Sequence, residues 1–148
     1  RLDNCPDVPG WPENNGCKEK QLVAINGCKI DLSKKIYFDT GRTVVKSRSY
    51  KMLNNLAQVL AAQKNIKSLR IEGHTDDRGA ASFNKQLSQQ RADAVRIYLE
   101  EQGIGPERLE AIGFGEERPV ESNATRRGRE NNRRVELIIG DCDESQFE

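Results

Sequence analysis

The sequence has one histidine, no Cys-x-x-Cys pair, and no apolar run long enough to span a bilayer as a helix. With a single imidazole, a zinc site would need all four cysteine thiolates at spacings unlike those of zinc knuckles. No serine or cysteine stands in a recognisable nucleophile setting, and His74 beside two aspartates is best explained as stabilising its own turn. The sequence therefore predicts no enzyme, no metal site and no cofactor.

An excess of charge of one sign is also absent. The 148 residues include 24 basic and 23 acidic side chains, which are interspersed, so a broad field that attracts polyanions is not expected. The densest positive patch, Arg126 to Arg134, supports an alternative hypothesis of nucleic-acid binding. Glutamates interrupt this patch and no aromatic residues interleave with it to stack bases, so we expect a solvated loop with one or two functional arginines and no nucleic-acid partner.

The four cysteines, Cys5, Cys17, Cys28 and Cys142, are even in number, as expected for two disulfides formed in an oxidising compartment. Three pairings are possible. We expect Cys5 to pair with Cys17 and Cys28 with Cys142, because this choice closes one local loop and ties the two ends of the domain together. The chain begins without an initiator methionine or a signal sequence, so we take it as a mature fragment or an excised domain of a longer exported protein.

Composition divides the chain into three parts. Residues 1–30 form a cysteine- and proline-rich linker segment, in which ordinary turn chemistry explains the Asp and Asn residues better than calcium binding does. Residues 31–142 have the length and apolar content of one compact domain, and residues 143–148 form a tail.

Hydrophobic periodicity predicts alternating strands and helices in this domain. We expect strand structure between 29 and 38, a helix over 47–63, a strand over 66–72, a helix over 83–102, and strands over 109–114 and 133–139, with a polar loop over 115–132. This order, βαβαββ, predicts an α/β (α+β) two-layer sandwich in which a mixed sheet carries both helices on one face.

Arg91 is the most informative residue of the second helix. On a helical wheel it falls inside the apolar sector that contains Leu87, where a guanidinium is partly desolvated and requires an anionic partner. Asn84 and Ser88 lie on the edge of the same sector. Something negatively charged is therefore expected at this end of the helix.

The loop that carries Thr75, Asp76 and Asp77 leads into the first turn of the same helix, so Arg91 is close enough to share a pocket with Asp76. A gap between Asp76 and Arg91 would suit a zwitterionic amino acid, since each charge would meet its opposite. The alternative is a plain salt bridge between these two side chains. The helical geometry alone supports both equally.

Many positions between residues 34 and 140 form a pattern at fixed spacing: Gly73-His74-Thr75-Asp76, Gly79, Asn84, Leu87-Ser88, Arg91-Ala92, Val95, Gly113-Phe114-Gly115-Glu116, Arg118-Pro119, Asn123 and Asn132-Arg133-Arg134-Val135-Glu136. This pattern resembles the OmpA-like C-terminal domain family, which also occurs in peptidoglycan-associated lipoproteins and flagellar motor stator proteins. The proline- and cysteine-rich head looks like the linker that some members place between a membrane barrel and this domain.

The resemblance implies non-covalent binding of the peptide stem of peptidoglycan, with a diaminopimelate, or another diamino acid, held between an acid and an arginine. The expected ligand-binding set, matched position by position, is Asp76, Arg91, Asn84, Thr75, Asp39, Thr40, Leu87 and Arg133. The function so implied is that of a non-catalytic periplasmic anchor, which ties the outer membrane to the cell wall through a membrane element outside this sequence. The same fold could instead anchor a motor or a secretion complex.

Overall fold

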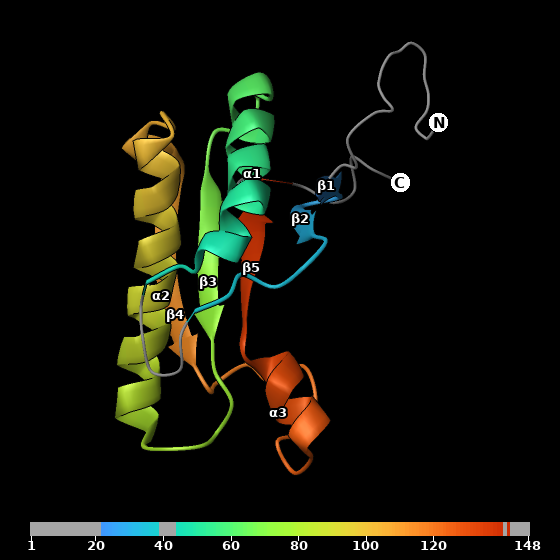
Figure 1. Ribbon diagram of the computed structural model, residues 1–148, viewed down its shortest axis with the longest axis vertical. Coiled ribbons are helices and arrows are strands. Elements are labelled where there is room, and N and C mark those ends of the chain that lie inside the picture. The colour runs from blue at the N-terminus through green and yellow to red at the C-terminus, as the bar shows by residue number, and fades with distance from the viewer. Residues whose placement is uncertain (1–21, 39–43, 141, 143–148) are drawn as a thin grey trace.

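The computed structural model describes residues 22–38, 44–140 and 142. Five strands form one mixed sheet in the order β1-β2-β5-β3-β4 (Figure 1). Neighbouring strands are antiparallel except β3 and β4, which are parallel. The strands are β1 (Val23–Asn26), β2 (Lys29–Leu32), β3 (Leu69–His74), β4 (Leu109–Gly115) and β5 (Arg134–Ile139).

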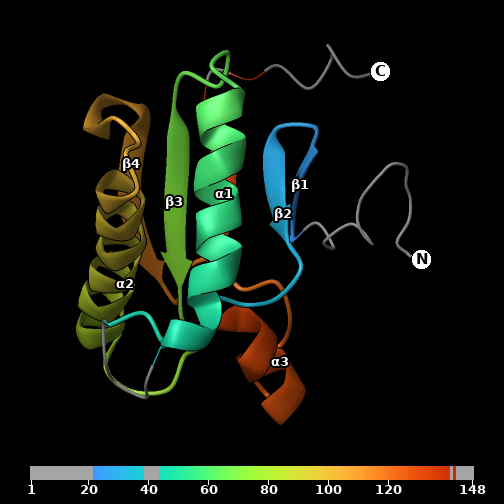
Figure 2. The same cartoon turned by 45° about the horizontal axis from the view of Figure 1, so that its top comes forward.

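The two long helices lie on the same face of this sheet (Figure 2). They are α1 (Tyr50–Ala62), which follows the short 3-10 helix η1 (Ser47–Ser49), and α2 (Ala81–Glu101). A second 3-10 helix, η2 (Pro106–Arg108), precedes β4, and α3 (Arg126–Asn132) lies beyond the end of the sheet, before β5. Among the described residues, no helix combines the length and the apolar character needed to cross a membrane.

The hydrophobic core fills the space between the sheet and these two helices. Each fully buried leucine or valine contributes about 1.5–3 kcal/mol of hydrophobic free energy relative to an exposed side chain. The least exposed core residues come from both layers: Leu53, Leu56 and Leu60 of α1, Val95 and Leu99 of α2, and Leu69, Ile71 and Leu137 of the sheet.

Two glycines let α2 pack unusually close to the sheet. A Cβ atom on Gly73 of β3 would lie 2.3 Å from the carbonyl oxygen of Ser88, and one on Gly113 of β4 would lie 2.2 Å from the backbone nitrogen of Gln89. The Ser88 hydroxyl accepts a hydrogen bond from the backbone N–H of Gly115, at 2.9 Å. These contacts fix the position of α2 relative to the carboxyl end of β3.

The expected two-layer α/β fold is confirmed, with two differences. The strand predicted over 29–38 ends at Leu32, and an additional strand, β1, pairs with it in a hairpin that turns at Gly27, whose φ is +62°. This hairpin crosses the boundary predicted between the linker segment, residues 1–30, and the domain, residues 31–142. The polar segment 115–132, predicted to be a loop, contains α3, because the Thr125 side chain caps that helix by accepting a hydrogen bond from the backbone N–H of Gly128.

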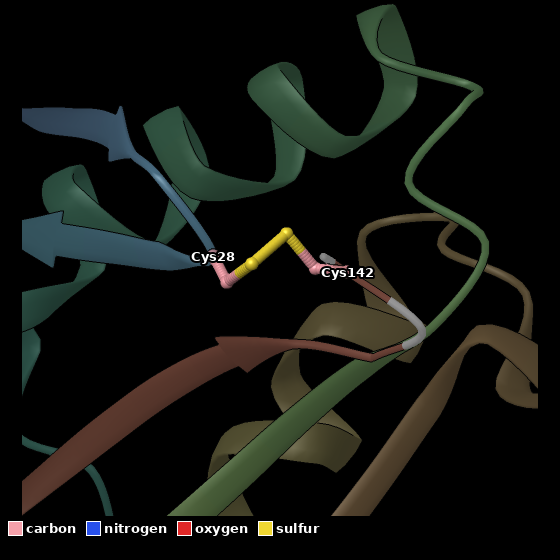
Figure 3. Close-up of a disulfide and its surroundings, with 2 residues drawn as sticks. All are labelled: Cys28 and Cys142. Atoms are coloured by element: carbon pink, nitrogen blue, oxygen red, sulfur yellow. A yellow bond between two sulfur atoms is a disulfide. The ribbon is translucent and has the colours of Figure 1, made fainter. Parts of the chain in front are cut away.

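A disulfide joins Cys28, in the hairpin turn, to Cys142, just beyond β5, with the Cα atoms 5.5 Å apart (Figure 3). This half of the predicted pairing is confirmed, and it links positions 114 residues apart in the sequence. The predicted pair of Cys5 and Cys17 lies outside the described residues.

Candidate functional site

A groove of about 970 Å³ opens where the loop after β3, the first turns of α2 and the end of α3 meet. It contains six of the eight expected ligand-binding residues; the other two, Asp39 and Thr40, lie outside the described residues. Its lining is formed by Lys35, Ile36, Tyr37, Phe38, Arg48, Thr75, Asp76, Arg78, Phe83, Asn84, Leu87, Arg91, Glu130, Asn131 and Arg133.

The loop after β3 holds Asp76 in a fixed, buried position. One oxygen of the Asp76 carboxylate accepts a hydrogen bond from the backbone N–H of Arg78 at 3.0 Å, and the Thr75 hydroxyl donates to the Asp76 carbonyl at 2.8 Å. The buried amide of Asn84 donates to the Arg78 carbonyl at 2.8 Å and to Glu116 at 3.3 Å. Thr75 and Asn84 therefore act mainly by holding this loop against α2.

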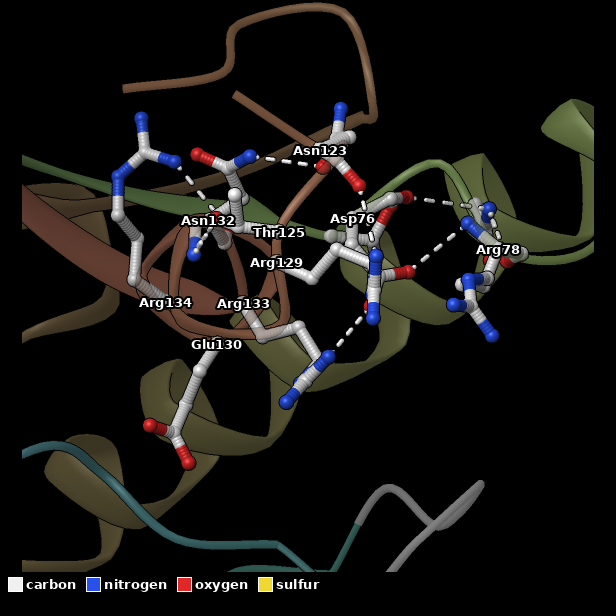
Figure 4. Close-up of polar contacts among 12 residues, drawn as sticks. Asp76, Arg78, Asn123, Thr125, Arg129, Glu130, Asn132, Arg133 and Arg134 are labelled. Atoms are coloured by element: carbon white, nitrogen blue, oxygen red, sulfur yellow. Dashed lines mark hydrogen bonds and ion pairs between the residues drawn. The ribbon is translucent and has the colours of Figure 1, made fainter. Parts of the chain in front are cut away.

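Asp76 forms its ion pair with Arg133, the residue that follows α3, and not with Arg91. The Asp76 Oδ2 and Arg133 Nη1 atoms lie 2.5 Å apart (Figure 4). Helical geometry left open a plain salt bridge between Asp76 and Arg91. Asp76 instead pairs with Arg133, which lies 57 positions away in the sequence. Arg133 remains partly open to solvent, with its side chain 45% exposed.

Arg91 is half-buried at the edge of the groove, as the helical wheel predicted. Its guanidinium carbon lies 4.9 Å from the centre of the Phe38 ring. Burial, and next the positive charge of Arg133, lower the pKa of Arg91. Leu87 lies one turn earlier and also lines the groove. Two guanidinium groups and one carboxylate therefore share the same part of the groove.

Asn132 holds the connection between α3 and β5, and sequence analysis assigned it no role. Its side chain is fully buried. Its amide oxygen accepts hydrogen bonds from the backbone N–H groups of Val120 and Glu121, at 2.8 and 3.0 Å, and its amide nitrogen donates to the Glu121 carbonyl at 2.9 Å. The same nitrogen donates to the Asn123 side chain at 2.8 Å (Figure 4). These four bonds fix the backbone immediately before Arg133.

Several charged residues of the groove come from segments without a recognisable motif and were not predicted from the sequence. Arg48 lies in η1, with its guanidinium 3.8 Å from the centre of the Tyr37 ring. The Lys35 ammonium donates a hydrogen bond to the Glu130 carbonyl oxygen, and burial, followed by the charge of Arg133, lowers the pKa of Lys35. The sequence signal that could have indicated these residues was the number of basic side chains between β2 and α1.

His74 belongs to a separate cluster on the sheet face opposite the helices. Its ring stacks on Phe114, with centroids 5.4 Å apart, and lies 3.4 Å from a carboxylate oxygen of Glu72, so it does not stabilise its own turn as the sequence predicted. Glu72, His74 and Glu136 offer ligand atoms within 4.8 Å of one another. However, Arg70 already pairs with Glu72 at 2.7 Å, and Arg134 pairs with Glu136. These guanidinium groups would repel a metal cation, so the cluster does not fit one.

The similarity of this chain to known proteins covers the groove and most of the fold. The sequence profile of the OmpA family matches residues 37–133. Outer membrane porin F of Pseudomonas aeruginosa is 41% identical over 141 residues, which cover 93% of this chain and only 38% of that porin. This chain thus spans about two fifths of the porin's length.

Two solved structures have the same fold. The crystal structure of the peptidoglycan-associated lipoprotein from Burkholderia pseudomallei has a TM-score of 0.65 and 34% identity, and the match covers 72% of this chain and 91% of that one. The cell wall anchor of the T6SS from Pseudomonas aeruginosa has a TM-score of 0.67 and 28% identity, covering 80% of this chain and 87% of that one.

Proposed function

This chain belongs to the OmpA family, and on that premise we propose that its groove binds the peptide stem of peptidoglycan without cleaving it. The proposed contact is with the zwitterionic end of a diamino acid, diaminopimelate, held between Asp76 and Arg91. Two relatives support peptidoglycan as the ligand, because one is a peptidoglycan-associated lipoprotein and the other is a cell wall anchor.

The observation that carries the proposal is that one buried carboxylate and two guanidinium groups meet in an open groove. A volume of about 970 Å³ leaves room for an amino-acid side chain and more. Because Asp76 is fixed by the Arg78 backbone, its carboxylate is positioned in advance to receive an ammonium group. A ligand carboxylate beside Arg91 would offset the repulsion between Arg91 and Arg133, which contributes to the lowered pKa of Arg91.

The remaining groove residues support these two contacts. Leu87 and the exposed ring of Phe83 would pack against the methylene groups that separate the charged ends of the ligand. Thr75 and Asn84 would hold the loop, and Arg133 would orient Asp76. Asp39 and Thr40 are proposed to line the same groove on the basis of the family resemblance alone.

In the cell, this binding would anchor an outer-membrane protein to the wall from the periplasmic side. The similarity to an outer membrane porin supports that placement, and many weakly binding copies along one polymer would hold firmly together. The similarity to a T6SS cell wall anchor favours a second candidate, in which the same groove secures a secretion complex.

Pulldown by purified peptidoglycan sacculi tests the proposed groove. We expect Asp76→Asn and Arg91→Gln each to weaken binding about 10- to 100-fold, because each removes one charge-assisted contact worth roughly 1.5–3 kcal/mol. Asp77→Asn and Arg127→Gln are matched controls, since they make the same charge changes at exposed positions outside the groove. Free diaminopimelate should compete with sacculi for the parent protein.

Circular dichroism melts separate binding from folding in this experiment. If both groove variants melt as the parent does and still sediment with sacculi as the parent does, the proposed site is wrong. Release of soluble muropeptides from sacculi would contradict the non-catalytic assignment.

A further inference from the structure

We propose that Arg48 and Arg78 form a second anionic subsite in this groove, which selects peptides that carry a free carboxylate in addition to the one bound by Arg91. This inference rests on the proposed function and concerns the class of stem peptide that the groove accepts. The ligand it identifies is a peptide in which glutamate is linked through its side chain, so that its α-carboxylate remains unblocked.

The charge of the groove carries the inference. Among the described residues, five basic side chains and two acidic ones line it, and Asp39, proposed above to line the same groove, would add a third acid. A zwitterionic ligand end has no net charge, so its binding leaves this positive surplus unchanged. Further ligand carboxylates would reduce the surplus, and a neutral peptide would not.

Three of the five basic residues are already assigned. Arg133 pairs with Asp76, and Lys35 donates to the Glu130 carbonyl oxygen. Arg91 is assigned above to the carboxylate of the zwitterionic end. Arg48 and Arg78 therefore remain for a second anion.

Arg48 is pre-positioned for this role. Its guanidinium stacks on Tyr37, which restrains the side chain and leaves the N–H groups at its edge directed away from the ring. Its side chain is exposed, and within the part of the chain that the structure describes no carboxylate forms an ion pair with it. A planar guanidinium in this setting is suited to bind a carboxylate through two hydrogen bonds.

Arg78 approaches the groove from the loop after β3. Its backbone N–H donates to Asp76 (Figure 4), and its carbonyl accepts from Asn84, so the backbone is held while the exposed side chain lines the groove. Like Arg48, it forms no ion pair with any described carboxylate. The two residues thus add positive charge without a matching acid from the described parts of the chain.

Calorimetric titration with two synthetic tripeptides tests the subsite. One is L-alanyl-γ-D-glutamyl-meso-diaminopimelate, and the other has the glutamate α-carboxylate converted to a carboxamide. We expect amidation to weaken binding to the parent protein about three- to tenfold, since exposed charge-assisted contacts are modest in strength. Arg48→Gln and Arg78→Gln should weaken binding of the acid form and leave binding of the amide nearly unchanged.

The double variant Arg48→Gln/Arg78→Gln should bind both peptides with the same affinity, whereas Arg127→Gln should retain the parent's preference. Equal affinity of the parent for the two peptides would overturn the subsite and leave the proposed function standing. The subsite would also be overturned if the double variant lost the same amount of affinity for the acid peptide and for the amide peptide. If the parent binds neither peptide, the proposed function itself fails, together with the inference that rests on it.

Discussion

Replacing Asn132 by alanine should both destabilise the fold and impair binding, although this residue does not line the groove. The substitution removes the partner of two backbone N–H groups, of the Glu121 carbonyl and of the Asn123 side chain. A buried polar group that loses its partner costs about 1–3 kcal/mol. Because the segment around Val120 and Glu121 is partly open to water, we expect a total loss of about 2–4 kcal/mol of unfolding free energy.

That loss corresponds to a fall of about 4 to 16 °C in the melting temperature for a chain of this size. Circular dichroism at 222 nm measures it directly, with Asn131→Ala as the control, because the Asn131 side chain makes a single exposed hydrogen bond to Glu121. Sacculus binding, measured below the melting range, should fall as well, since the backbone before Arg133 loses its support. A melting temperature within about 2 °C of the parent would refute this account of Asn132.

Three further changes test other parts of the structure. Gly73→Ala should lower the unfolding free energy by about 1–3 kcal/mol in urea titration, because the new methyl group would meet the Ser88 carbonyl; an unchanged midpoint would contradict the close packing of α2. Burial lowers the pKa of His74 below its usual 6.5, so the unfolded chain binds a proton more readily and stability should fall as the pH drops below about 6.5. His74→Gln should lose that part of the pH dependence, and identical slopes in both proteins would count against it. Replacing Cys28 and Cys142 by serine should cost about 4–5 kcal/mol, measured by the same urea titration; equal midpoints would argue against a stabilising link.

The sequence predicted those features that depend on local periodicity or on the family motif. The apolar stripe of α2 was sufficient to place Arg91 in a half-buried position. The sequence allowed three cysteine pairings, and the chosen one, which ties the two ends of the domain together, paired Cys28 with Cys142 as the structure does. The order of strands and helices was sufficient to predict a two-layer fold, because each long helix has an apolar face that must pack on a sheet.

The features that were missed depend on tertiary contacts. The helix α3 contains arginine, glycine and asparagine in place of an apolar stripe, and it is held by the Thr125 cap and by the buried Asn132. The strand β1 has a single buried residue, Val23, so its sequence carries little alternation. The pairing of Asp76 with Arg133 joins two segments that no helical or strand periodicity relates.

The disulfide beside the hairpin has a mechanical consequence for a protein proposed to hold two cell layers together. If tension enters the domain from the N-terminal side, it first reaches β1, which can unzip from β2 one hydrogen bond at a time. Peeling stops at Cys28, where the covalent link carries the load across to the chain end next to β5, in the interior of the sheet. Under load, β1 would therefore detach from the sheet and lengthen the chain slightly. The strands beneath the groove would stay folded.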